Sequence, residues 1–69
     1  MSRLEILGQN IKKYRKAKKL TQLQLATALD CRYEYISKIE KGKMTISLTK
    51  LFKIADILNT KMTDLINFD

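Results

Sequence analysis

The stretch from Thr21 to Lys43, TQLQLATALDCRYEYISKIEKGK, decides how this chain folds. Its pattern predicts two short helices joined by a tight turn. In the second helix Ile36 and Ile39 form an apolar face, because helical neighbours lie three or four residues apart. The opposite face carries hydrogen-bonding and cationic groups: Tyr33, Glu34, Ser37, Lys38 and Lys41. A helix with these two faces suits the major groove of DNA.

The size and composition predict one compact domain. The chain has 69 residues, a hydrophobic fraction of 45% and no proline, so it is too apolar for intrinsic disorder and long enough for a single core. The lone cysteine, Cys31, cannot form an internal disulfide, which is typical of a reducing cytosol. Neither a signal peptide nor an apolar run of roughly 20 residues is found. We therefore expect a small cytoplasmic protein that does not associate with membranes.

Positive charge is the second feature. Fourteen Lys and Arg residues stand against seven Asp and Glu, for a net charge of +7 and a pI near 9.8. Half of the cations fall within the first 20 residues: Arg3, Lys12, Lys13, Arg15, Lys16, Lys18 and Lys19. Such an excess attracts polyanions, although charge alone leaves DNA, RNA, an anionic membrane and a merely solvated face open. A membrane-surface helix needs a free apolar face, whereas here the apolar faces are expected to form a core.

Helical periodicity extends to both sides of the central stretch. Apolar residues at helical spacing predict a first helix from about Arg3 to Lys18: Leu4, Leu7, Ile11 and Tyr14. Thr21 and Gln24 form a capping-box pattern at the start of the second helix. The buried stripe of that helix is Leu25, Ala26 and Leu29. The turn falls at residues 30–31, and a third helix is expected at about 32–41.

The remaining residues predict two further helices. Gly42 is placed to close the third helix, and residues 43–46 form a loop. Ser47 is the expected N-cap of a fourth helix that ends at Leu58, before Asn59 in a left-handed conformation. Its inner face is predicted to be Leu48, Leu51, Ile54, Ala55 and Leu58. A last short helix is expected at about 62–67, with Leu65 inside.

The apolar positions, the Leu20-Thr21-Gln22 opening and the ending from Ser37 to Lys43 carry a family resemblance. In type and spacing they resemble the helix-turn-helix domain of the Cro and phage-repressor type. That family includes xenobiotic-response-element-like regulators, phage repressors, restriction–modification controller proteins and some antitoxins. The resemblance covers about residues 11–66. It implies an all-α, compact five-helix bundle, like the lambda-repressor DNA-binding domain, occupying residues 1–69 as one domain.

Two positions depart from the family pattern. Asp30 replaces the usual glycine of the turn, and Arg32 stands where a capping Ser or Thr is common. Asp tolerates the left-handed backbone better than most residues, so the turn is expected to be intact. Arg32 cannot cap through an oxygen, which leaves its side chain free to reach a phosphate or a base.

The resemblance also implies roles for single residues. The base-reading candidates are Arg32, Tyr33, Glu34, Ser37 and Lys38, whose side chains can donate to or accept from base edges. The phosphate-contact candidates are Arg15, Gln22, Lys43 and Thr45. Arg15 and Glu40 are expected to form an ion pair between the first and third helices, and Tyr35 is expected to be mainly structural. For each candidate the alternative is an ordinary solvated residue.

Apolar residues beyond the needs of the core cluster late in the chain. Phe52, Ile57, Ile66 and Phe68 are predicted to form a homodimer interface, the alternative being that they complete the small core. A dimer would place two half-sites about one turn of DNA apart.

The sequence contains no motif that indicates an enzymatic function. Histidine is absent, Cys31 has no metal-ligand spacing around it, and no Gly-rich phosphate loop or close carboxylate pair is found. We therefore expect no catalytic residue, no metal and no cofactor, and Cys31 is predicted to be a buried small hydrophobe.

We predict a transcriptional repressor or controller that binds double-stranded DNA at an operator as a homodimer. The first alternative is an antitoxin-type interaction module that also binds its own promoter. The second is an architectural protein with little sequence preference. A toxin or RNA polymerase partner stays open.

Overall fold

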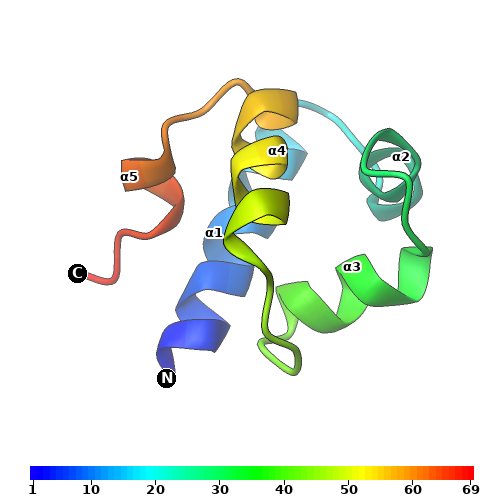
Figure 1. Cartoon of the computed structure of the whole chain (residues 1–69). Coiled ribbons are helices and arrows are strands. Elements are labelled where there is room, and N and C mark those ends of the chain that lie inside the picture. The colour runs from blue at the N-terminus through cyan, green and yellow to red at the C-terminus, as the bar shows by residue number, and fades with distance from the viewer.

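Five α-helices and no strand make up the computed structural model, which describes residues 1–69. In chain order they are α1 (Arg3–Ala17), α2 (Gln22–Ala28), α3 (Tyr33–Glu40), α4 (Leu48–Leu58) and α5 (Met62–Leu65). α1 and α4 lie in the middle, α2 and α3 on one side, and α5 on the other (Figure 1). The predicted all-α five-helix bundle is confirmed. None of the helices combines the length and the apolar character that crossing a bilayer requires.

Three helices begin at a hydroxyl side chain that accepts a free N–H of the first turn. Thr21 Oγ1 accepts from the Gln24 N–H at 3.0 Å, and the Gln24 side chain accepts from the Thr21 N–H at 2.8 Å, so the predicted capping box is confirmed. Ser47 caps α4 as predicted. A second capping box joins Ser2 and Glu5. Hydrogen bonds from Ser2 lower the pKa of the Glu5 carboxyl, and the bond from the backbone N–H has the larger effect.

Four helices end at a residue with left-handed backbone. These residues are Lys19 (φ 60°), Asp30 (φ 55°), Gly42 (φ 72°) and Asn59 (φ 51°). In each case the N–H of the next residue bonds to the carbonyl five positions back, which satisfies a free carbonyl of the last turn. The expectations for Gly42 and Asn59 are confirmed, and the Asp30 turn is intact.

Each helix contributes one large side chain that solvent does not reach. These side chains are Ile11, Leu25, Ile36, Ile54 and Leu65, all among the predicted apolar positions. The prediction for Leu48 was wrong, since its side chain is 61% exposed. Leu48 is the first residue of α4, and burial along this helix begins one turn later, at Leu51.

A glycine lets α1 approach α3 very closely. A Cβ placed on Gly8 would lie 2.3 Å from the carbonyl oxygen of Ile39 and 2.7 Å from that of Glu40. No side chain fits between those backbones. Gly42 has a similar role, because its Cβ would lie 2.6 Å from the Cα of Glu5. These two contacts fix how the end of α3 sits on α1.

Candidate nucleic-acid interface

α3 buries one face and exposes the other. Ile36 and Ile39 are at most 2% exposed, whereas Tyr33 is 47% exposed. Glu34 and Lys38 also face solvent. The amphipathic pattern of the sequence therefore corresponds to a real division of the helix surface.

The start of α3 leaves its N-cap side chain free. Arg32 is the N-cap residue and makes no side-chain capping bond, as predicted. Its exposed guanidinium therefore keeps its donors for another partner. Ser37 lies one turn into α3 and is half-buried. All five base-reading candidates thus belong to α3 or to the residue before it.

A buried ion pair holds the other end of α3 against α1. Arg15 Nε donates to Glu40 Oε2 at 2.6 Å, and Arg15 Nη2 donates to Glu40 Oε1 at 3.1 Å. The two side chains are 7% and 2% exposed. The ion pair expected from the family resemblance is confirmed. A buried charge without such a partner is strongly destabilising, so the pair fixes the position of α3.

α2 joins the same carboxylate. Gln22 Nε2 donates to Glu40 Oε1 at 2.9 Å, and Arg15 Nη1 donates to the Leu20 carbonyl at 2.7 Å. The sequence reasoning treated Gln22 only as a phosphate contact and missed this bond. Glu40 therefore ties α1, α2 and α3 together directly behind the exposed face of α3.

The remaining phosphate-contact candidates follow α3. Lys43 and Thr45 are exposed in the connection to α4. The Lys43 N–H bonds to the Lys38 carbonyl at 2.9 Å, so the start of this connection is held to the last turn of α3.

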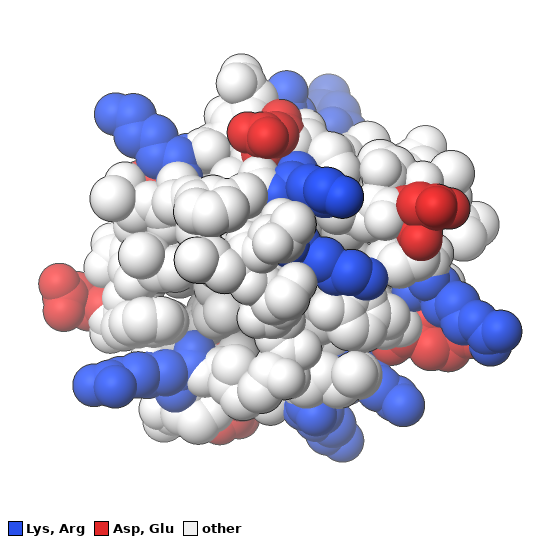
Figure 2. Space-filling view, viewed as in Figure 1, with Lys and Arg blue, Asp and Glu red and all other residues white.

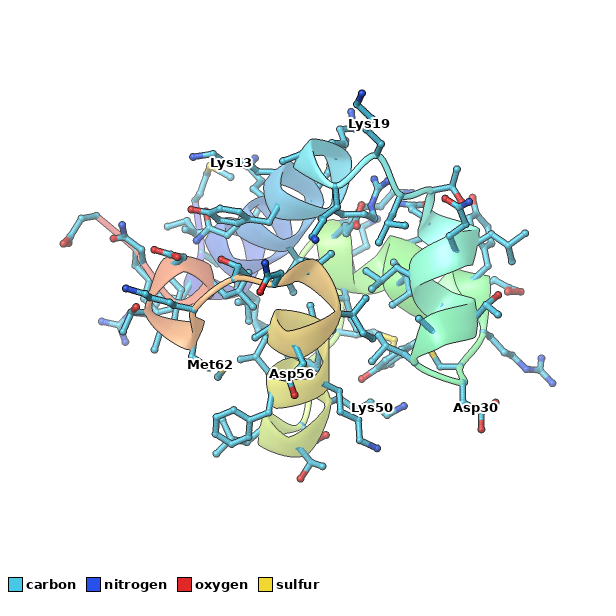
Figure 3. The ribbon with its side chains drawn as sticks, turned by 90° about the horizontal axis from the view of Figure 1, so that it is seen from above. Lys13, Lys19, Asp30, Lys50, Asp56 and Met62 are labelled. Carbon is cyan, nitrogen blue, oxygen red and sulfur yellow. The ribbon has the colours of Figure 1, made fainter.

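Positive charge is largely unpaired on the surface. Arg15–Glu40 is the only ion pair within 4.0 Å, so none of the lysines has a carboxylate partner. Lysine and arginine side chains extend outward around the outline of the molecule (Figure 2). Lys13 and Lys19 project from the α1 side and Lys50 from the α4 side (Figure 3). A free cationic surface of this kind attracts a polyanion.

Tyr35 of α3 and Cys31 of the turn before it are both partly buried against the core. Lys50 Nζ lies 4.5 Å from the centre of the Tyr35 ring, a cation–π distance, and Tyr35 packs against the core. Its mainly structural role agrees with the prediction. Cys31 is partly buried against the same core. Burial raises the pKa of its thiol, and the nearby charge of Lys50 partly offsets this effect.

The predicted dimer residues divide into two groups. Phe52, Ile66 and Phe68 are 50%, 43% and 39% exposed, whereas Ile57 is partly buried against the core. Figure 2 shows a broad uncharged area on the α5 side of this face, with charged side chains near its middle, where α4 runs. Leu48, at 61% exposure, adds to the exposed apolar surface of α4.

α5 is shorter than predicted and is held by a residue that sequence reasoning missed. It ends at Leu65 rather than near Asn67, because the backbone turns away from helical geometry at Ile66 (ψ 23°). Asn10 Nδ2 donates to the carbonyls of Leu65 and Asn67, both at 2.9 Å. A polar residue among the apolar positions of α1 was the only sequence signal for this contact.

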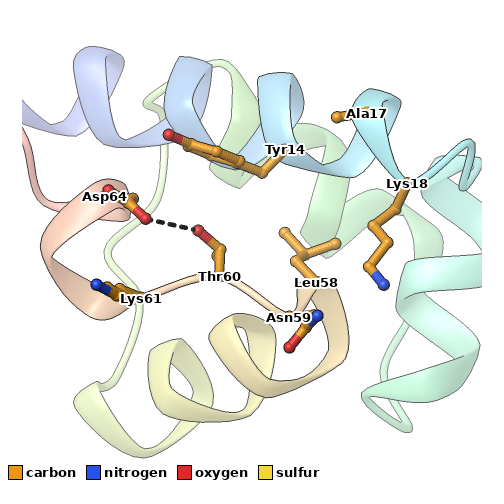
Figure 4. Close-up of a pocket in the computed structure, with 8 residues that line it drawn as sticks. All are labelled: Tyr14, Ala17, Lys18, Leu58, Asn59, Thr60, Lys61 and Asp64. Atoms are coloured by element: carbon orange, nitrogen blue, oxygen red, sulfur yellow. Dashed lines mark hydrogen bonds between the residues drawn. The ribbon is translucent and has the colours of Figure 1, made fainter.

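A pocket of about 570 Å³ lies away from these residues, between the end of α1 and the α4–α5 connection (Figure 4). Tyr14 and Lys18 line one side, and Asn59 and Lys61 lie across from them. Thr60 Oγ1 and Asp64 Oδ2 are hydrogen-bonded to each other at 3.2 Å. The pocket contains no residue predicted to contact DNA. No group of three or more Cys, Asp and Glu side chains is arranged to hold a metal ion.

Known proteins are similar to this chain in sequence and in fold. The family described as helix-turn-helix matches residues 11–65. An uncharacterized HTH-type transcriptional regulator from Archaeoglobus fulgidus is 41% identical over 59 residues, which cover 86% of this chain and 83% of that protein. The control protein C.SmaI from Serratia marcescens is 34% identical over 62 residues, covering 90% and 74% of the two chains.

A solved structure also resembles this chain in fold and in sequence. The restriction–modification controller protein C.AhdI from Aeromonas hydrophila superposes with a TM-score of 0.84 at 31% identity. The superposition covers 90% of this chain and 94% of C.AhdI.

Proposed function

The chain belongs to the helix-turn-helix family of DNA-binding transcriptional regulators, and we propose that it acts by placing α3 in the major groove of an operator. One observation carries this proposal. α3 presents polar and cationic side chains on one face, while Glu40 on its inner side is locked to α1 and α2. A recognition helix needs both an exposed reading face and a fixed orientation.

The exposed side chains supply the chemistry for reading bases. Arg32 and Lys38 can donate to the O6 and N7 acceptors of guanine, and Glu34 can accept from the N4 amino group of cytosine. Tyr33 and Ser37 can each donate or accept through a hydroxyl. We assign direct base contact to this set, with Tyr33 and Glu34 in the first turn of α3.

The phosphate contacts are assigned to residues around this face. Lys43 and Thr45 follow α3 and are exposed. Arg15 and Gln22 are largely engaged with Glu40. An arginine side chain has five N–H donors, however, and the hydrogen bonds of Arg15 use only three of them. Their remaining hydrogens are assigned to a phosphate oxygen. Such contacts position a protein on DNA without reading sequence.

We further propose that the active form is a homodimer that meets through α4 and the C-terminal residues. Phe52, Ile66 and Phe68 are the exposed apolar residues of this surface. Contact between identical surfaces about a two-fold axis gives a symmetric dimer, and binding to two half-sites one turn of DNA apart requires its two α3 helices to lie about 34–36 Å apart. The names of C.SmaI and C.AhdI favour a controller protein over a toxin-binding antitoxin.

Selection of bound sites from random duplex DNA tests this proposal. The expected result is an enriched motif with two-fold symmetry and half-sites about one helical turn apart. Binding to the enriched site is expected to exceed binding to a scrambled duplex by about 10³-fold or more at the same salt concentration. Equal binding to both duplexes, with a steep salt dependence, would instead identify an architectural binder and contradict the proposal.

A further inference from the structure

The pocket between the end of α1 and the α4–α5 connection has the size of a small-molecule site. Its volume is about 570 Å³, and ligand pockets commonly span about 300–1,000 Å³. Tyr14 and Ala17 of α1 and Leu58 of α4 supply its apolar lining. Leu58 is buried and Tyr14 packs against the core, so the bundle holds this wall in place. A rigid apolar wall suits the flat body of a small ligand.

The polar lining of the pocket is divided between two ends. Lys18 and Asn59 lie at one end, and Lys61 and Asp64 lie at the other (Figure 4). The only hydrogen bond among the lining side chains joins Thr60 Oγ1 to Asp64 Oδ2. Lys18 and Asn59 are both exposed, and the Lys18 ammonium group has no carboxylate within 4.0 Å. The first end therefore offers free N–H donors and contains no negative charge.

The charge of the lining limits the charge of a ligand. Two ammonium groups and one carboxylate leave one positive charge in excess. A phosphate monoester carries a charge of about −1.5 to −2 and would bring more negative charge toward Asp64. A carboxylate carries a single charge, and its two oxygens can accept from an ammonium group and from an amide at once. A molecule with one carboxylate and one aromatic ring therefore matches both the cationic end and the apolar wall.

We propose that this pocket binds a small aromatic carboxylate. The carboxylate of the ligand accepts hydrogen bonds from Lys18 Nζ and Asn59 Nδ2, and its ring lies against Tyr14 and Leu58. The charge of Asp64 disfavours the anion at the opposite end, which sets the orientation of the ligand. The pocket contains none of the residues assigned to DNA contact or to the dimer interface. This inference therefore stands independently of the proposed function.

Two probes of the same shape test the proposal on the wild-type chain. Benzoate is the simplest aromatic carboxylate, and benzamide is its neutral counterpart. Backbone amide shifts in an NMR titration locate the binding site and give the dissociation constant, which for so small a ligand is expected in the millimolar range. We expect benzoate to shift the amides of Lys18, Asn59 and Thr60 in a saturable manner. Benzamide should bind about fivefold or more weakly, since it lacks the charge that strengthens the hydrogen bonds.

Lys18→Gln removes the charge at the proposed carboxylate site, and Lys16→Gln is the matched control. Lys16 is also exposed and lies in the last turn of α1, but it does not line the pocket. Lys18→Gln should weaken benzoate about threefold or more, the scale of an exposed ion pair, and leave benzamide unchanged. Lys16→Gln should leave both unchanged. Asn59→Gly removes the amide while suiting the left-handed backbone, and it should also weaken benzoate.

Three results would overturn the proposal. The first is benzoate that shifts none of the amides that line the pocket at tens of millimolar. The second is benzamide that binds as tightly as benzoate, because the pocket would then select no anion. The third is equal weakening by Lys18→Gln and Lys16→Gln, which would indicate attraction to the positive charge of the whole chain. The first two results use the wild-type chain alone, so they hold whether or not a variant folds.

Discussion

Arg15 and Glu40 form a two-bond ion pair between α1 and α3, with donor–acceptor distances of 2.6 and 3.1 Å. The carboxylate also accepts from Gln22 on α2. The buried side of α3, opposite the face proposed to read DNA, is therefore fixed by charged and polar groups, and solvent scarcely reaches the side chains of Arg15 and Glu40.

Removing Glu40 should destabilise the fold far more than removing Glu34. Glu40→Ala leaves the buried guanidinium of Arg15 unpaired, and loss of one partner of a buried pair costs about 3–5 kcal/mol. Glu34 is exposed and has no ion-pair partner, so Glu34→Ala should change the free energy of unfolding by less than about 0.5 kcal/mol. Urea unfolding of both variants checks this. Equal free energies would contradict the structural role of the pair.

Gly8→Ala should push α1 away from α3. The added Cβ would lie 2.3 Å from the Ile39 carbonyl oxygen, and backbone on that side cannot yield easily. Alanine favours the helix by about 1 kcal/mol, but we expect the clash to outweigh this and to leave a net loss of about 2 kcal/mol. Gln9→Ala, at the next, exposed position of α1, should be neutral or stabilising. Thermal unfolding of the two variants compares them directly, and a stabilised Gly8→Ala would show that the contact is not tight.

Lys19→Gly should stabilise the protein. Lys19 has a φ of 60°, a conformation that costs a side-chain-bearing residue roughly 1–2 kcal/mol. Glycine relieves this cost, but its greater conformational freedom in the unfolded chain offsets about 0.5–1 kcal/mol of the stabilisation. A net stabilisation of about 0.5 kcal/mol or more is expected for Lys19→Gly, and a smaller one for Asp30→Gly, because Asp tolerates this region better. Differential scanning calorimetry measures both, and a lower melting temperature for Lys19→Gly would refute the argument.

The Cys31 thiol should react only under alkaline conditions. Burial raises its pKa in the folded state, so the half-maximal rate of alkylation should lie above the ordinary value of about 8.5. Because the unfolded state then loses its proton first, stability should fall as the pH rises past that ordinary value. Lys50→Ala should raise the midpoint further, since the charge of Lys50 lowers this pKa. The rate of iodoacetamide reaction against pH tests these statements, and a midpoint below 8.5, the ordinary value, would exclude them.

Much of the fold could be predicted because helical periodicity reports burial directly. Leu25, Ile36 and Ile54 each belong to the apolar stripe of a different helix, and each is fully buried. Leu48 has the same spacing and is exposed, since periodicity does not show where the neighbouring helices end. The caps at Thr21 and Ser47 were equally predictable, because capping depends on a few adjacent residues.

The contacts that sequence reasoning missed join residues far apart in the chain. Asn10 binds carbonyls more than 50 positions away, and no local pattern encodes that pairing. Gly8 carried a weak signal, a single glycine within a helical pattern, which often has a packing reason. The bond from Gln22 to Glu40 was hidden because one polar side chain suits several partners. The exposed face of α3, by contrast, could be predicted from its two-sided composition alone.

The central claim is that the outer face of α3 reads the sequence of the operator. The most direct measurement repeats the selection from random DNA with Lys38→Ala and, as a control, with Lys43→Ala. We predict that Lys38→Ala loses the base preference at one position of each half-site, at a cost of about 1–3 kcal/mol for the original base pair. Lys43→Ala should bind all sequences more weakly and retain the wild-type motif, as expected of a phosphate contact. An unchanged motif with Lys38→Ala, and with each of the other base-reading candidates replaced by alanine in turn, would contradict the claim that α3 reads the bases.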